Sequence, residues 1–364
     1  MAMNLNIDTY ASNLTCTSYK PQINNLNIVL AKSNLPFENH SVLNPACIQH
    51  ENITHMFYRA VRKTNMQSTI GYCQLKNNII IKKSNRPILI PEHKYESHGI
   101  EDPRIVKIND TYYLTYTVFD GKTALVGYAS STKLPHFNKH GLLFPKILFR
   151  ETKNIFAQTV TGKAFLKFHK NYLNRYLLAN DPIWMKNIVL FPKKINGKYA
   201  LIYRVLPGMQ ISYFDDFEQL TKDYWLEQFS HLDDHKLFYP YFNFEAHHVA
   251  PGCPPIETAK GWLLIYHAVD NSAPKQKYYA CAALLDLDNP QKVIARLKYP
   301  LFSPENEWEK TGVVDNVVFP SGAVIQQEKL HIYYGAADNV IAAKSIDLAE
   351  LLYSLERSKL LTIK

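Results

Sequence analysis

The sequence predicts an all-β fold, a five-bladed β-propeller, and three observations lead to this expectation. A proline, a short apolar run, a polar turn and an apolar strand that ends in tyrosine recur five times along the 364 residues. A further β-like segment follows each of these tyrosines. Aromatic residues make up 13% of the chain, which contains 24 tyrosines, and such side chains favour sheets.

Each repeat is typical of a β-hairpin. Turn residues such as Asn196-Gly197 and Lys260-Gly261 separate the two apolar runs and favour chain reversal. Five such units predict five blades whose innermost strands begin at the mouth of one central funnel. The five pairs are Pro45 with Tyr58, Pro103 with Tyr116, Pro192 with Tyr203, Pro255 with Tyr266 and Pro320 with Tyr334.

The propeller is expected to occupy residues 41–345 as one catalytic domain. Residues 1–40 are polar and rich in asparagine, so we expect an N-terminal extension that packs on the propeller. An insertion at about 138–185 is basic and aromatic and carries no blade pattern. Residues 346–364 are expected to form a C-terminal helix and tail, because apolar residues recur there at helical spacing: Leu348, Leu351, Leu352 and Leu355.

The net charge of +9 and the isoelectric point near 9.0 are compatible with nucleic acid, a membrane surface or an anionic substrate. The lysines are dispersed, no run of five like charges occurs, and no nucleic-acid-binding motif is present. We therefore expect no nucleic-acid partner and favour a concentrated anion site in the funnel.

Metal and disulfide chemistry are not indicated. The five cysteines form no CxxC pair and are odd in number, which favours reduced thiols. The adjacent His247 and His248 are expected to point to opposite faces of an extended strand, so they cannot easily share one ion. No leader-like N-terminus and no 18-residue apolar run are present, and we expect a cytoplasmic protein without membrane association.

The segment 99–105 carries the main candidate for acid catalysis. Glu101 and Asp102 stand directly before Pro103, at the expected start of an innermost strand. A like-charged neighbour and partial burial are expected to raise the pKa of Asp102, as a general acid requires. The alternative is a turn cap or a salt bridge between Asp102 and Arg104.

The repeat brings further polar residues to the same funnel. Arg59, Arg204 and His267 follow three of the tyrosines, while Asn44, Lys186 and His248 stand near strand starts. One acid facing several basic groups suits a site that holds phosphate opposite a protonating carboxylate, because Arg and Lys bind phosphate oxygens by charge-assisted hydrogen bonds.

Six motifs in order resemble glycoside hydrolase family 130. The similarity covers about residues 40–345 and implies a five-bladed propeller with inverting chemistry on β-mannosides. Most members carry out phosphorolysis that yields α-mannose 1-phosphate, and a minority hydrolyse β-1,2-linked mannosides. The motifs are Glu-Asp-Pro-Arg at 101–104 and the runs at 190–199, 261–267, 283–288, 316–322 and 334–338.

The resemblance also implies roles for single residues. Asp102 matches the general acid, which protonates the leaving oxygen through a hydroxyl of the bound mannose. Lys186 and His248 stand where related phosphorylases often have arginine and lysine, and they are expected to complete the phosphate site. Residues that match phosphate ligands are Arg204 and His267, and those assigned to the mannosyl unit are Asn44, Arg59, Glu101 and Asp338.

Phosphorolysis is the preferred prediction, with inorganic phosphate as co-substrate and no cofactor. An inverting hydrolase would need a second carboxylate roughly 6.5 to 9.5 Å from the first, and Glu245 is the candidate base, unless it is a surface charge of its strand. A non-catalytic sugar-binding propeller is the third alternative. The expected substrate is a β-manno-oligosaccharide; its linkage, its acceptor and any homo-oligomer are left open.

Overall fold

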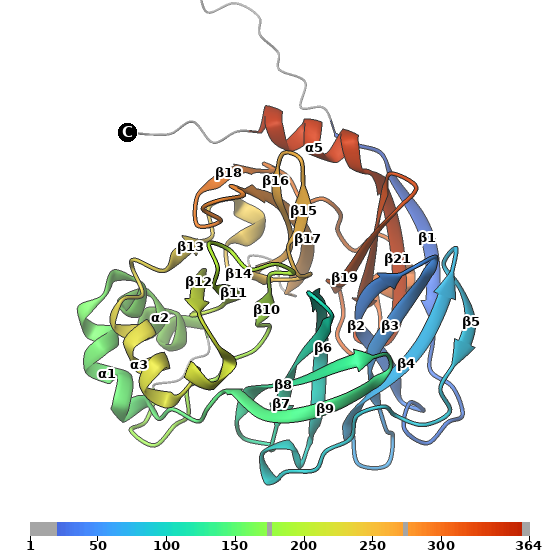
Figure 1. Cartoon of the computed structure of the whole chain (residues 1–364). Helices are drawn as coiled ribbons and strands as arrows, with labels where there is room; N and C mark the ends of the chain where they lie inside the picture. The colour runs from blue at the N-terminus through green and yellow to red at the C-terminus, as the bar shows by residue number, and fades with distance from the viewer. Residues whose placement is uncertain (1–19, 173–176, 272–275, 359–364) are drawn as a thin grey trace, which may run out of the picture.

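The computed structural model describes residues 20–172, 177–271 and 276–358. Strands are the main regular element of this part of the chain, and they form antiparallel units that follow one another around the centre of the molecule in chain order (Figure 1). None of its helices combines the length and the apolar character needed to span a membrane.

The first two units form one hydrogen-bonded sheet. A single parallel pair, Ser68 opposite Gly99, joins them, whereas all other pairings within them are antiparallel. The first unit contains β2 (Ser41–His50), β3 (Ile53–Val61), β4 (Ser68–Lys76) and β5 (Ile79–Lys83). The second contains β6 (Gly99–Ile108), β7 (Thr111–Phe119), β8 (Ala124–Lys133) and β9 (His136–Phe144).

The third and fourth units are separate antiparallel sheets. In the fourth unit the first strand is split, because β14 and β15 both pair with β16 on either side of Pro254 and Pro255. The third unit contains β10 (Val189–Leu190), β11 (Tyr199–Tyr203), β12 (Met209–Phe214) and β13 (Lys236–Phe238). The fourth contains β14 (His248–Pro251), β15 (Ile256–Thr258), β16 (Gly261–Asp270), β17 (Lys277–Leu285) and β18 (Val293–Arg296).

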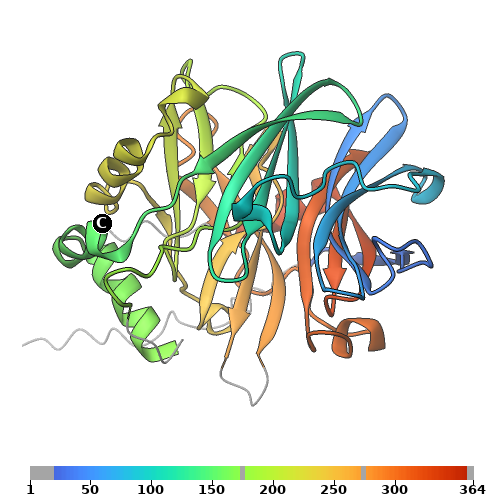
Figure 2. The same ribbon diagram turned by 90° about the horizontal axis from the view of Figure 1, so that it is seen from below.

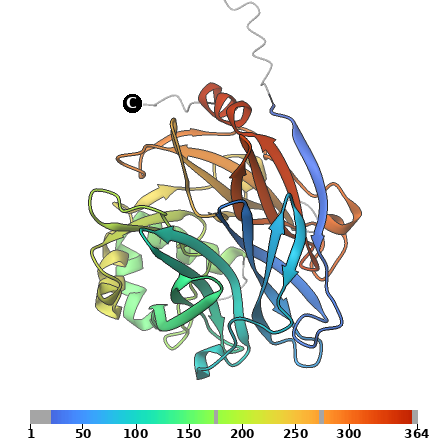
Figure 3. The same cartoon turned by 45° about the vertical axis from the view of Figure 1, so that its right-hand side comes forward.

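The fifth unit combines both ends of the chain. Strand β1 (Ile23–Leu30) pairs antiparallel with β21 (Val340–Asp347). On its other edge β21 pairs with β20 (Lys329–Ala336), and β20 pairs with β19 (Val318–Gln326). Figure 3 shows β1, in blue, alongside the red strands of this unit. A segment of the expected N-terminal extension therefore supplies the fourth strand of the last sheet.

The helices lie outside the sheets. Helices α1 (Phe149–Gln158) and α2 (Val160–Tyr172) fall in the expected insertion 138–185, whose first residues belong to β9. They pack with α3 (Lys222–Ser230) at one edge of the molecule (Figures 1 and 2). The others are α4 (Glu307–Lys310), α5 (Leu348–Arg357) and the short 3-10 turns η1 (Lys94–Glu96), η2 (Phe217–Gln219) and η3 (Asn243–Glu245).

Helix α5 confirms the amphipathic pattern read from the sequence. Asp347 caps its N-terminus by accepting a hydrogen bond from the Glu350 amide. Leu351 and Leu355 are fully buried in the core shared with the last two units. This burial fixes the helix against the sheets.

All five predicted hairpins are paired strands in the structure, and the tyrosine of each second strand is buried. In three units this tyrosine donates a hydrogen bond to a buried glutamate that precedes the first strand. The pairs are Tyr58 with Glu38 at 2.7 Å, Tyr266 with Glu245 at 2.7 Å and Tyr334 with Glu309 at 2.5 Å. In the second unit Glu96 raises the pKa of Tyr116, after the larger effect of burial.

Each of these glutamates also pairs with a cation from a later strand of its unit: Glu38 with Lys83, Glu96 with Lys139, Glu245 with Arg296 and Glu309 with Lys344. The third unit is different. Lys186 stands three residues before its first strand, where the first, second and fourth units have glutamate, and the Tyr203 hydroxyl has no hydrogen-bond partner among the described residues. The position three residues before the first strand is therefore a buried glutamate in the first, second and fourth units and a lysine in the third.

Candidate active site

Two β-bulges turn Asn44 and Asp102 toward the same space. The register shifts between Leu43 and Ala46 in β2 and between Glu101 and Arg104 in β6. Asn44 and Asp102 have φ angles of 48° and 51°, although each precedes a proline, which favours extended backbone. Asn and Asp tolerate this left-handed region better than other side chains do. The two side chains meet, because Asn44 Nδ2 donates to Asp102 Oδ1 at 2.8 Å.

These side chains line a cavity of about 330 Å³. Every residue that the sequence assigned to the site contributes to its wall except Glu101 and Glu245. Sequence reasoning missed the remaining members of the wall. The assigned residues are Asn44, Arg59, Asp102, Lys186, Arg204, His248, His267 and Asp338, and the others are Trp184, Asn187, Tyr278, Val314, Val317 and Phe319.

One side of the cavity gathers carboxylates around Arg59. Its guanidinium contacts Glu101 at 2.8 Å and Asp102 at 3.5 Å. Lys186 Nζ lies 3.2 Å from the other oxygen of Glu101. Glu101 therefore holds two basic residues of the wall in place without lining the cavity itself.

The pKa of Asp102 differs from the expectation. Burial raises it, but the positive charges of Arg59 and Lys186 and the hydrogen bond from Asn44 outweigh burial and lower the pKa below its ordinary value. The expected rise is therefore wrong for the protein without bound anion. The sequence argument considered the charge of Glu101, whereas Glu101 is itself paired with the two cations that act on Asp102.

The alternative salt bridge between Arg104 and Asp102 does not form. Arg104 is buried and donates to the backbone oxygens of Asp102, Pro103 and Gly252. It therefore ties the bulge of β6 to the backbone that follows β14, and the Asp102 carboxylate is left to the cavity.

Asp338 is the second carboxylate of the wall. Burial raises its pKa to about 6, and the charges of Asp102 and Glu101 add to this effect, against the opposing influence of Arg59 and Lys186. Its φ of 52° is again in the left-handed region. A carboxylate destabilised in this way is typical of functional sites.

The wall of the cavity also contains Arg204, His248 and His267. Burial lowers the pKa of Arg204 to about 10, so it remains a cation near neutral pH. It forms no ion pair with any carboxylate in the described part of the chain. A half-buried guanidinium without an ion-pair partner favours the binding of an anion.

Both histidines beside Arg204 are neutral near pH 7. Burial lowers the pKa of His248 and of His267 well below the ordinary value, and the positive charge of Arg204 lowers both further. The His267 ring packs against Phe319, with centroids 4.5 Å apart. These residues therefore offer hydrogen bonds around a single cation, rather than a set of three positive charges.

Several polar atoms of the wall lack a partner. Buried Asn44 Oδ1, Asn187 Oδ1 and His267 Nδ1 make no hydrogen bond within the described residues. Buried polar groups are nearly always satisfied, so such atoms need an explanation. All three atoms are enclosed by protein, and Asn44 Oδ1 packs so closely on Gly335 that a Cβ there would lie 2.2 Å from it.

The geometry argues against the suggested role of Glu245 as a hydrolytic base. Its side chain is fully buried and does not line the cavity. Its oxygens accept hydrogen bonds from Arg296, Tyr266 and the amides of Tyr241 and Phe242. A carboxylate enclosed in this way cannot activate a water molecule at the sugar.

The expectation that His247 and His248 point to opposite faces is also wrong. Their Nδ1 atoms lie 2.6 Å apart, because β14 begins at His248 and His247 precedes the regular strand. No group of three or more His, Cys, Asp or Glu side chains placed to hold a metal ion occurs within residues 20–172, 177–271 and 276–358.

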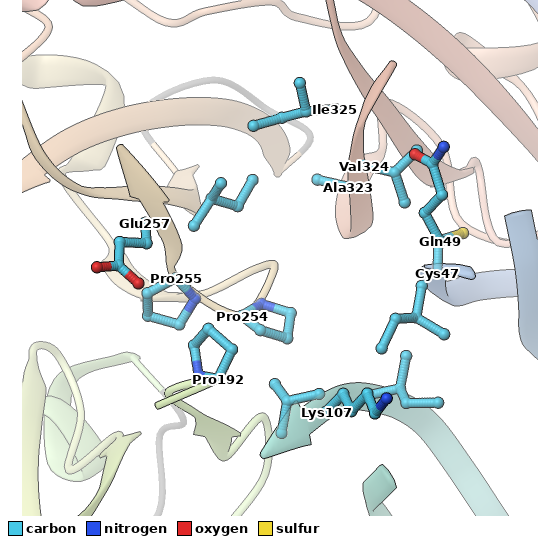
Figure 4. Close-up of a pocket in the computed structure, with 14 residues that line it drawn as sticks. Cys47, Gln49, Lys107, Pro192, Pro254, Pro255, Glu257, Ala323, Val324 and Ile325 are labelled. Atoms are coloured by element: carbon cyan, nitrogen blue, oxygen red, sulfur yellow. The ribbon is translucent and has the colours of Figure 1, made fainter. Parts of the chain in front are cut away.

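A second cavity, of about 300 Å³, lies further along the same inner strands. Figure 4 shows side chains of all five units around it, including Cys47, Lys107, Pro192, Pro255 and Val324. Cys47 and Lys107 lie three and five residues beyond Asn44 and Asp102, which is roughly 10 to 17 Å along a strand. This cavity lacks the paired acid and cation groups of the first one.

The comparisons with known proteins identify the family of the chain. The family model described as beta-1,4-mannooligosaccharide phosphorylase, for glycoside hydrolase family 130, matches residues 18–357. A 1,2-beta-oligomannan phosphorylase of Thermoanaerobacter sp. (strain X514) is 31% identical over 90% of this chain and 96% of its own length. The chain belongs to glycoside hydrolase family 130.

Relatives within family 130 differ in linkage. A beta-1,4-mannooligosaccharide phosphorylase of Ruminococcus albus is 27% identical over 87% of this chain and 85% of its own. The solved structure of a beta-1,2-mannobiose phosphorylase from Listeria innocua, with beta-1,2-mannobiose, has a TM-score of 0.68 at 21% identity and covers 92% of this chain and 99% of its own. The protein is thus an enzyme of the β-mannoside phosphorylase family, and this membership leaves the linkage open.

Family 130 also includes hydrolases. One solved structure has a TM-score of 0.68 at 25% identity and covers 92% of this chain and 96% of its own. Its description states that the GH130 family of mannoside phosphorylases contains glycoside hydrolases that target beta-1,2 mannosidic linkages in Candida mannan. The choice between phosphate and water as nucleophile must therefore be argued from the cavity itself.

Proposed function

We propose that this family 130 enzyme is an inverting phosphorylase that cleaves a β-mannoside with inorganic phosphate and releases α-mannose 1-phosphate. The observation that carries the proposal is Arg204, which has no ion-pair partner among the described residues and lines the cavity together with two neutral histidines. Arginine is well suited to bind phosphate, because its planar fork donates several charge-assisted hydrogen bonds.

In the proposed reaction, Arg204, His248, His267 and Lys186 hold phosphate against the face of the mannosyl ring opposite the leaving oxygen. A phosphate oxygen forms the new bond to C1 while the glycosidic C–O bond breaks. The proton of Asp102 passes to the leaving oxygen, through a mannose hydroxyl as the family resemblance implies. Asn44, Arg59 and Asp338 grip the mannosyl unit, and Glu101 keeps Arg59 and Lys186 in position.

Bound phosphate also supplies what Asp102 needs to act as an acid. The pKa of Asp102 is low because of Arg59 and Lys186. A phosphate anion beside Lys186 would offset part of this positive charge, and desolvation by the sugar would favour the neutral carboxyl. Binding of both substrates is therefore expected to move the pKa of Asp102 toward neutral pH.

Hydrolysis is less well supported. An inverting hydrolase needs a carboxylate that activates water on the far side of the sugar. Asp338 is the carboxylate that lines the cavity in addition to Asp102, and its charge interacts with Arg59, as that of Asp102 does. The described lining therefore offers no carboxylate beyond Asp102 and Asp338, whereas it offers Arg204, His248 and His267 to a phosphate.

We also propose that the five sheet units are the blades of a five-bladed propeller. Contacts between neighbouring units support this arrangement, since β2 touches β6, β6 touches β10, β11 touches β14, β16 touches β19 and β19 touches β2. Such a closed circuit gathers residues from all units at one axis. Asn44, Asp102, His248 and Asp338 come from four different units.

Incubation with β-1,2- and β-1,4-linked manno-oligosaccharides, with and without inorganic phosphate, tests the proposed function. We expect mannose 1-phosphate to form only when phosphate is present. Free mannose without phosphate would establish hydrolysis instead. Saturable binding without any product would indicate a non-catalytic sugar-binding protein.

A further inference from the structure

A second histidine stands behind the pocket residue His248. We propose that His247 is a positioning residue that fixes the orientation and tautomer of His248, so that His248 Nε2 donates a hydrogen bond to phosphate. This inference rests on the proposed phosphorolysis. It concerns a residue that does not line the cavity.

The contact between the two rings is short and enclosed. The Nδ1 atoms of His247 and His248 lie 2.6 Å apart, and both side chains are buried. At this distance one nitrogen must carry hydrogen and the other must offer its lone pair, because two N–H groups or two lone pairs would repel. The pair therefore forms an N–H···N hydrogen bond.

The backbone and a neighbouring helix hold this arrangement. The His247 amide donates to the Val269 oxygen at 2.9 Å, and His248 pairs with Val269 in the sheet. Phe168 of α2 packs edge-on against both rings, with centroid distances of 4.9 Å to His247 and 6.1 Å to His248. These contacts oppose rotation of either ring away from the other.

The direction of the hydrogen bond decides what His248 can offer to the cavity. Burial lowers the pKa of both histidines, and Arg204 and His267 lower that of His248 further, so each ring is neutral and carries one proton. If His247 donates, the proton of His248 lies on Nε2 and can bind a phosphate oxygen. If His248 donates, its Nε2 lone pair would repel that oxygen.

This arrangement accounts for histidine at a position where related phosphorylases often have lysine. A lysine ammonium has three donors and can bind phosphate in many orientations. A neutral imidazole has only one N–H, so both the tautomer and the ring angle matter. His247 supplies both constraints.

The test compares His247→Leu with His247→Asn by steady-state kinetics of phosphorolysis. Leucine removes the donor, whereas the asparagine amide can donate from nearly the position of Nδ1. We expect the Leu variant to raise the KM for phosphate about tenfold, as expected for one lost charge-assisted hydrogen bond. Its KM for the mannoside should change less than twofold, and the Asn variant should remain close to wild type.

His55→Leu is the matched control, because His55 is a buried histidine of the first unit whose Nδ1 contacts the Tyr72 hydroxyl at 2.7 Å, away from the cavity. This variant is expected to lose stability without a selective change in the KM for phosphate. Equal changes in both KM values of His247→Leu, no change at all, or an Asn variant as impaired as the Leu variant would overturn the inference.

A second measurement does not depend on turnover. In ¹⁵N-histidine-labelled wild-type protein, His248 should show a protonated Nε2 and an unprotonated Nδ1, with the signal assigned by its loss in His248→Gln. The opposite tautomer contradicts the inference. Phosphate-independent cleavage by the wild type would refute the proposed function itself, and the kinetic assay reveals this before any variant is made.

Discussion

The side chains of Asp102 and Asn44 are positioned by an unfavourable backbone conformation. Both adopt positive φ directly before a proline, at a bulge in an inner strand. Such conformations cost of order 1 to 3 kcal/mol each and persist only when the surrounding structure imposes them. Here Arg104 supplies part of that constraint through the backbone oxygen of Asp102. The strain has a use, because it aims both side chains into the cavity.

Asp102→Asn tests the acid directly. The variant keeps a side chain that tolerates the left-handed region but has no transferable proton, so we expect kcat for phosphorolysis to fall by about 10²- to 10⁴-fold. At neutral pH the urea unfolding midpoint should also fall, because the lowered pKa of Asp102 means that its charged form stabilises the fold. Turnover within tenfold of wild type would show that another group donates the proton.

Asp338→Asn is expected to be more stable but less active than the wild type. The pKa of Asp338 is about 6 in the folded protein, against an ordinary value of 3.8. Between these values the unfolded chain loses its proton while the folded chain keeps it. Stability from this group is therefore complete below about pH 4 and is lost as the pH rises through 6.

The variant does not ionise, so at pH 7.5 its free energy of unfolding should exceed that of the wild type by roughly 2 kcal/mol. At pH 4 the difference should largely disappear. Urea denaturation at both pH values measures this. A gain of equal size at pH 4 and pH 7.5 would mean that the pKa of Asp338 is not the cause.

At the scale of the strands and their connections, the recurring element is a glutamate, a tyrosine and a cation. Each glutamate anchors the turn before an inner strand to the tyrosine of the next strand. The tyrosines were visible in the sequence because they repeat. The glutamates precede them by 20 or 21 residues in three units and by 25 in the fifth, so the same search would have found them and explained Glu245.

Tyr203 provides a natural comparison, because its hydroxyl has no partner among the described residues whereas that of Tyr266 binds Glu245. Tyr266→Phe is expected to lower the free energy of unfolding by about 2 kcal/mol, as for a hydrogen bond to a charged group. Tyr203→Phe should be neutral or stabilising by up to about 1 kcal/mol. Equal losses in the two variants, measured by urea denaturation, would disprove the distinction.

Glu245→Gln separates structure from catalysis. It leaves the buried Arg296 without its carboxylate, so we expect a loss of about 3 kcal/mol in the free energy of unfolding. At a temperature where the variant is folded, kcat should remain within about threefold of wild type. Glu309→Gln is the matched control, because Glu309 makes the corresponding contacts, with Tyr334 and Lys344, in the fifth unit. A hundredfold loss of kcat in the Glu245 variant alone would restore it as a catalytic base.

At the scale of the molecule, the hairpins and the grouping of the site followed from the repeat alone. Equivalent positions in equivalent units meet at one place, so Asn44, Asp102, Arg204 and His267 could be assigned to a common cavity before any coordinates were known. Contributions from connecting segments could not be foreseen. Trp184, for example, lies between α2 and β10, where no repeat constrains its position.

The protonation state of Asp102 could not be predicted from the sequence, for a different reason. It depends on which charges are nearest, and Lys186 reaches Asp102 and Glu101 from a different unit. The contact between His247 and His248 likewise depends on where β14 begins. If the strand began one residue earlier, the two rings would point to opposite faces; it begins at His248, and the rings meet. Such details follow from strand ends, which sequence patterns locate least well.

Closure of the circuit relies on close contact between the first and last units. Ser321 donates to the Pro45 oxygen at 2.8 Å, and a Cβ on Gly322 would lie only 2.8 Å from that same oxygen. Strand β1 adds a second tie, because it places the N-terminal segment on the sheet built from the C-terminal strands. The cavity therefore depends on both ends of the chain, although its residues lie between them.

The source of the oxygen on C1 of the released mannose tests the central claim most directly. The enzyme is supplied with a β-mannoside and ¹⁸O-labelled phosphate in ordinary water, and the products are examined by mass spectrometry and ³¹P NMR. We predict α-mannose 1-phosphate with ¹⁸O in the bridge between C1 and phosphorus. Free mannose whose C1 oxygen comes from water would contradict the account.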